Sequence, residues 1–75
     1  MRTFDQNKKE LKEIARNSFL YRALPQQLPQ FEKEVDMLVY NPGAERFVDY
    51  MINMFNEGER QIMALAMVIQ ETLWS

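Results

Sequence analysis

Apolar residues recur at the three- and four-residue spacing of an α-helix along most of this chain, and few residues interrupt the pattern. The two glycines and three prolines all fall between segments that have this spacing. No segment shows the alternation of β-branched and aromatic residues that is typical of strands. The sequence therefore predicts an all-α fold.

We expect a small bundle of four helices, over residues 4–23, 29–40, 42–55 and 57–73. Thr3 is predicted to cap the first helix, because Gln6 follows at the spacing of a capping box. Pro25 ends that helix, and Pro29 is placed as the first residue of the second. Asn41, followed by Pro42, is the predicted cap of the third helix.

The boundary between the third and fourth helices has two interpretations. Asn56 followed by two acidic residues is typical of a new helix start, which favours a break. The apolar stripe nevertheless continues in phase from Phe47 to Leu73, so one long kinked helix over 43–73 is the alternative. Such a helical hairpin would be incomplete until it paired with a second copy. In both cases the third segment is expected to bury a broad stripe, made of Ala44, Phe47, Val48, Met51, Met54 and Phe55.

A chain of 75 residues forms one domain, here residues 1–75, with a thin core. Neither cysteine nor histidine is present, so disulfides and a zinc site of the usual kind are not expected. Self-association is the remaining common way to stabilise a core of this size. We therefore expect a homodimer.

The sequence also predicts a location. The first residues lack the apolar stretch of a secretory signal. The longest apolar run, Ile62 to Ile69, is far shorter than the roughly 20 residues of a membrane-spanning helix. We expect a cytoplasmic protein that does not contact a membrane.

Catalysis at neutral pH has little support, because the chain lacks histidine and cysteine as proton carriers and nucleophiles. Two pairs of carboxylates stand four residues apart, Glu32 with Asp36 and Glu45 with Asp49. We interpret both pairs as solvated faces, since calcium and magnesium sites gather more oxygen ligands in a shaped loop. No phosphate-binding or dinucleotide-binding motif occurs. We expect no enzyme activity, no metal and no cofactor.

Charge is distributed unevenly along the chain. Residues 1–24 carry six basic and three acidic groups, whereas residues 25–75 carry three basic and eight acidic groups. A basic row on the first helix consists of Lys8, Lys9, Lys12 and Arg16. This row is interpreted first as a solvated face that complements the acidic helices, and otherwise as a binding face for a protein or, less well, for nucleic acid.

The last helix has more apolar surface than one core face can use. Its first arc consists of Ile62, Leu65, Ala66, Ile69 and Leu73. A second arc, about 100° away around the helix, consists of Met63, Met67, Gln70 and Trp74. Either this helix is surrounded within its own bundle, or the second arc is a protein interface, for which methionine and tryptophan are well suited.

These features together predict a small interaction or regulatory protein, a modulator, inhibitor or adaptor that acts through a helical surface and forms a homodimer. Its predicted partners are a second copy, an unidentified protein, or both. The alternative is a nucleic-acid-associated regulator that uses the basic row.

Overall fold

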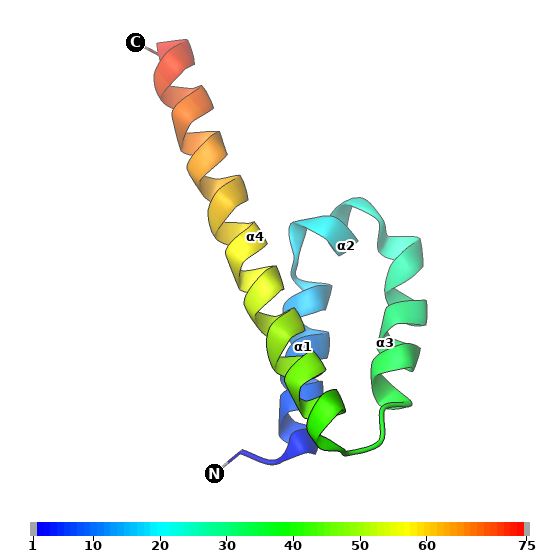
Figure 1. Ribbon diagram of the computed structural model, residues 1–75. Helices are drawn as coiled ribbons and strands as arrows, with labels where there is room; N and C mark the ends of the chain where they lie inside the picture. Colours follow the sequence, from blue (N-terminus) through cyan, green and yellow to red (C-terminus); the bar gives the residue numbers. More distant parts are fainter. Residues whose placement is uncertain (1, 75) are drawn as a thin grey trace.

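The computed structural model describes residues 2–74, and only the backbone of Trp74. The elements in chain order are α1 (Phe4–Arg16), α2 (Phe19–Ala23), the short 3-10 helix η1 (Pro25–Gln27), α3 (Leu28–Asp36) and α4 (Pro42–Trp74) (Figure 1). Within these residues there is no strand, so the prediction of an all-α fold is confirmed.

Two of the predicted helix caps are confirmed. The Gln6 amide N–H donates to the Thr3 hydroxyl over 3.1 Å, and the Thr3 N–H donates to the Gln6 side chain over 2.9 Å. At the start of α4, the Asn41 side-chain oxygen accepts from the Ala44 N–H over 2.9 Å, with Pro42 as the first helical residue. These local hydrogen bonds satisfy amide groups that have no partner inside a helix.

The first helix ends at Arg16, so the predicted helix over 4–23 is wrong. The Asn17 side chain donates to the Glu13 carbonyl over 3.0 Å. The Ser18 hydroxyl donates to the Ala15 carbonyl over 2.6 Å and accepts from the Tyr21 N–H over 3.4 Å. Short polar side chains compete in this way with helical hydrogen bonds, and here they turn the chain into the separate helix α2.

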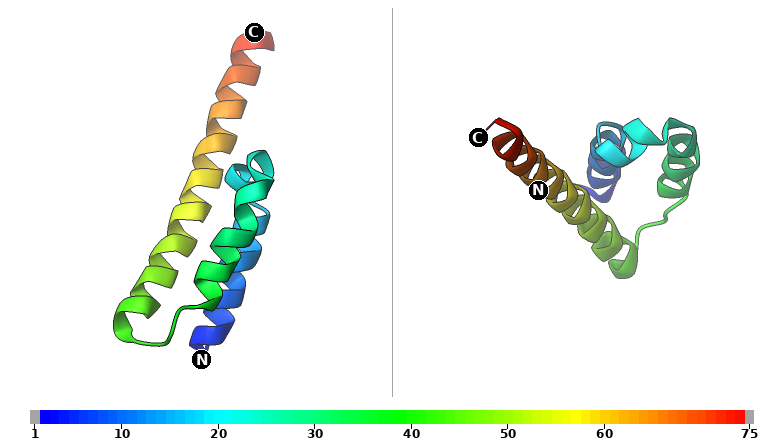
Figure 2. Two further views of the ribbon diagram at one scale, coloured as in Figure 1. Left: turned by 90° about the vertical axis from the view of Figure 1, so that its right-hand side faces the viewer. Right: turned by 90° about the horizontal axis from the view of Figure 1, so that it is seen from above.

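The helix predicted over 29–40 begins at Leu28 and ends earlier, at Asp36. The cause is the separation in space between α3 and the start of α4, which the linker has to span (Figure 2). A non-helical segment over 38–40 does this, since extended chain covers about 3.3 Å per residue, more than twice the rise of a helix.

The favoured break between the third and fourth helices is also wrong, because residues 42–74 form the single 33-residue helix α4. Gly58 has no positive φ and continues the helix. Phe55 precedes it and packs against the rings of Tyr21 and Phe31, at centroid distances of 6.1 and 5.8 Å. Glu59 follows it and accepts from the Phe19 N–H over 2.6 Å. Contacts on both sides of the glycine hold the helix to the rest of the chain.

The core engages only the first half of α4. Leu11, Val35 and Val48 are fully or almost fully buried and join α1, α3 and α4. Beyond α2, the second half of α4 extends away from the other helices (Figure 2). The longest dimension is 51 Å, and the radius of gyration is 15.1 Å, against about 11 Å for a compact chain of this length. A single chain is thus elongated.

Candidate interaction surface

The distal segment of α4, defined as residues 60–73, is exposed at every position. Met63 is 64% exposed, Leu65 60% and Leu73 75%. Monomeric soluble proteins seldom present contiguous apolar patches larger than a few hundred Å². This segment is therefore the strongest candidate for an interaction surface in the described part of the chain.

The structure places the predicted interface arc on this segment. Met63, Met67 and Gln70 are exposed, whereas the Trp74 side chain lies outside the described residues. The first arc, for which Ile62 and Ile69 are examples, is exposed as well. Every residue of both arcs whose side chain the structure describes is exposed. The choice of one arc as the interface stays a prediction.

Two residues of the predicted buried stripe are exposed instead. Phe47 is 46% and Met54 50% exposed, and Tyr50 on the same side of α4 is 60% exposed. In the described part of the chain, the other helices pack against the Val48 side of α4. Farther along α4, Leu65 and Val68 continue this exposed side. We call these five residues the outer row. A seven-residue repeat in the sequence, Phe47, Met54, Gln61 and Val68, is the signal that could have revealed it.

A groove of about 250 Å³ runs between α2 and α4. Its lining is mostly apolar and includes Leu20, Phe55 and Ile62, together with Met54 of the outer row. Gly58 also lines the groove, and a Cβ added there would meet no heavy atom within 4 Å. The groove thus has room for a side chain beside the outer row.

Three of the four basic-row residues are engaged with α3 and the linker that follows it. Lys8 donates to the carbonyl oxygens of Asp36 and Leu38, over 3.1 and 3.0 Å. Lys12 pairs with the Asp36 carboxylate over 2.6 Å. Arg16 pairs with the Glu32 carboxylate over 2.6 Å. A phosphate bound on this face would compete with these contacts.

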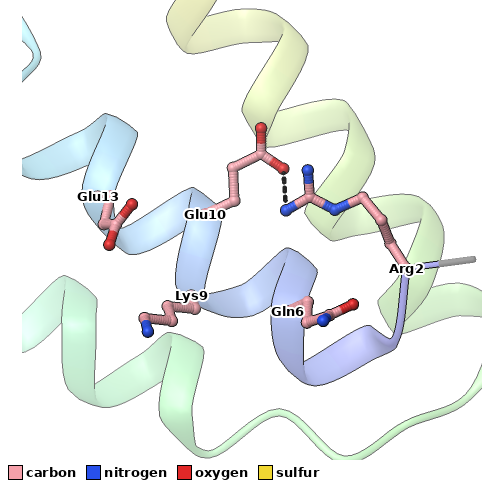
Figure 3. Close-up of a pocket in the computed structure, with 5 residues that line it drawn as sticks. All are labelled: Arg2, Gln6, Lys9, Glu10 and Glu13. Atoms are coloured by element: carbon pink, nitrogen blue, oxygen red, sulfur yellow. Dashed lines mark ion pairs between the residues drawn. The ribbon is translucent and has the colours of Figure 1, made fainter.

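Lys9, the fourth cation, lines an open hollow on α1 of about 550 Å³ (Figure 3). Its other lining residues are Arg2, Gln6, Glu10 and Glu13. Arg2 pairs with Glu10 over 2.8 Å, and Lys9 points away from this pair (Figure 3). Two cations and two carboxylates balance in the hollow, so its charge favours neither anions nor cations.

The titratable groups form few clusters. Within residues 2–74, no three histidine, cysteine, aspartate or glutamate side chains come together in a way that could hold a metal ion. Burial raises the pKa of the Tyr21 hydroxyl above its ordinary value of 10.0, and the negative charge of Glu34 raises it further.

Over residues 2–74, no helix has the length and apolar character needed to span a membrane.

No protein-family model matches the chain, and comparisons with curated proteins and with solved structures found no match.

Proposed function

We propose that this protein is a non-catalytic interaction protein that works as a homodimer through α4. The observation that supports the proposal is the run of exposed side chains from Arg60 to Leu73, in which apolar residues cover most of the helix surface. An exposed helix that is apolar on most sides is unfavourable in water, and each Å² of apolar surface that is covered contributes about 25 cal/mol.

A second copy of the same chain is the simplest partner for this surface. Two copies present identical surfaces, and a twofold axis pairs the same surface of each copy in one interface. A stable interface buries about 800 Å² on each partner, which is about an eighth of the 6079 Å² surface of this chain. The small core, built around three buried side chains, would gain stability from this contact.

As a dimer, the protein would act as a cytoplasmic modulator or adaptor by presenting helical surfaces to another protein. The nucleic-acid alternative has less support, because Lys8, Lys12 and Arg16 already contact α3 or its following linker. Phosphate binding depends on cations that are free to neutralise the backbone charge.

The test is the solution mass, measured by sedimentation equilibrium from micromolar to hundreds of micromolar protein. We expect twice the chain mass of 9.0 kDa at the upper end for the wild type. The double variant Leu65→Glu/Met67→Glu places charge on both sides of the distal segment and is expected to be monomeric with unchanged helix content.

The matched control is Met37→Glu, since Met37 is an exposed methionine outside α4. It should leave the mass unchanged. A wild-type mass of one chain at every concentration would show that the proposed self-association is wrong.

A further inference from the structure

We infer that the two copies pair in antiparallel orientation along the whole of α4, about a twofold axis between Gly58 and Glu59. The inference rests on the proposed function and specifies its geometry. The distal segment of each copy would lie along the proximal part of the outer row of the other copy, at Phe47, Tyr50 and Met54.

The outer row has the spacing of a paired helix. The five residues of the outer row lie on one side of α4. Together with Gly58 and Gln61 between them, they follow the three- and four-residue steps of a coiled-coil seam. That side is adjacent to the one that packs on α1, because successive residues such as Phe47 and Val48 point about 100° apart. Among residues 2–74, no other helix covers it (Figure 2).

Charge complementarity supports the antiparallel orientation. Arg46, Glu57, Arg60 and Glu71 lie on one flank of the outer row. With the axis between Gly58 and Glu59, Arg46 lies opposite Glu71 of the second copy. Glu57, which also pairs with Arg60 of its own chain over 3.8 Å, lies opposite Arg60 of the second copy. In a parallel pair this flank of the two copies would lie on opposite sides of the interface, so these charges would not meet and would contribute no attraction.

The same register also makes the apolar side chains interdigitate. Leu65 of the second copy falls between Tyr50 and Met54, and Val68 of the second copy falls between Phe47 and Met51. Gly58 lies beside the axis and has no side chain to keep the helices apart. Ile62 of the second copy lies level with Phe55, where it can enter the 250 Å³ groove beside α2.

The length of the contact favours this arrangement over a shorter one. Overlap from Arg46 to Glu71 spans about 39 Å of helix, whereas pairing of the distal segments alone spans about 21 Å. The longer contact comes closer to the roughly 800 Å² per partner of a stable interface. Met63 and Met67 lie on the opposite side of α4 and remain accessible, so the dimer surface differs from the arc predicted from the sequence.

The first experiment compares two double variants by sedimentation equilibrium. Leu65→Glu/Val68→Glu should raise the dimer dissociation constant by about 100-fold or more, because it places charges in the seam. Met63→Glu/Met67→Glu is the matched control and should change the constant by less than about threefold. The opposite ranking would overturn this pairing while leaving the proposed homodimer intact, whereas a monomeric wild type would overturn both.

The second experiment reads the orientation from cross-links in a chain that has no native cysteine. Asn53 and Ala64 lie on the charged flank, and the inferred axis places each opposite the other in the second copy. A mixture of Asn53→Cys and Ala64→Cys treated with a short bismaleimide should yield covalent dimers that contain one chain of each.

Either variant alone should give almost no covalent dimer, because the cysteines of its two copies stand about 16 Å apart along the helices. Efficient cross-linking of either variant alone would contradict the inferred antiparallel register. A dimeric mixture that gives no cross-link would show that the register is wrong. Both outcomes overturn the inference without affecting the proposed homodimer.

Discussion

At the scale of single residues, Lys8 caps the end of α3. Its ammonium group donates to the carbonyl oxygens of Asp36 and Leu38 and lies 5.5 Å from the centre of the Phe4 ring. Carbonyl groups at a helix end have no partner within the helix, and a cation there also interacts favourably with the helix dipole. Lys9, its neighbour, makes no hydrogen bond or ion pair with the described residues.

Lys8→Ala should therefore lower the free energy of unfolding by about 1 kcal/mol, the usual contribution of such hydrogen bonds. Lys9→Ala is the matched control and should change it by less than about 0.5 kcal/mol. Urea denaturation followed by circular dichroism measures both. Equal effects of the two substitutions would contradict the capping role of Lys8.

Tyr21 makes the stability of the fold sensitive to alkaline pH. Its pKa in the folded chain is raised above 10.0, so the folded state holds this proton more tightly than the unfolded state does. The resulting stabilisation is fully present below pH 10.0 and is lost as the pH rises through the folded-state pKa. Tyr21→Phe should reduce this loss, as measured by urea denaturation at a series of pH values above neutrality. An identical alkaline decline in the variant would exclude Tyr21 as its source.

At the scale of helices, local sequence predicts the first residue of a helix better than the last. Thr3 and Asn41 were predictable as caps because each bonds to an amide three residues away. The break at Ser18 was not predicted, although its hydroxyl also acts locally. Part of the stabilisation of α2 comes from Glu59, forty residues away, and no spacing rule relates such distant residues.

The continuity of α4 gives a test at its two glycines. Gly58→Ala should raise the free energy of unfolding by about 0.5–1 kcal/mol, because alanine favours the helix and the added Cβ meets no neighbour. Gly43→Ala is the contrasting variant, since its Cβ would lie 3.1 Å from the capping oxygen of Asn41. Gly43→Ala should raise the free energy of unfolding less than Gly58→Ala does, or should lower it.

Both variants are measured at dilutions where the chain is monomeric, so that dimer contacts do not contribute. A loss of stability in Gly58→Ala would contradict a continuous helix through residues 57–60.

At the scale of the whole molecule, the apolar surface of the chain exceeds what its own helices cover. The sequence showed this excess as two arcs on the last helix, but it placed Phe47 and Met54 in the core. Helical spacing predicts which residues share a side. It does not show how far the neighbouring helices reach, and α1, α2 and α3 leave the distal segment of α4 without cover. The exposure of the distal segment could not be predicted from the sequence, because it depends on how much longer α4 is than α1.

The central claim is that a second copy covers the distal segment, and hydrogen exchange measured as a function of protein concentration tests it most directly. Amides from Ile62 to Leu73 should become more protected as the concentration rises, whereas amides near Val48 should be protected throughout, because that part of α4 packs on α1. Protection of residues 62–73 that is the same at all concentrations would contradict the account.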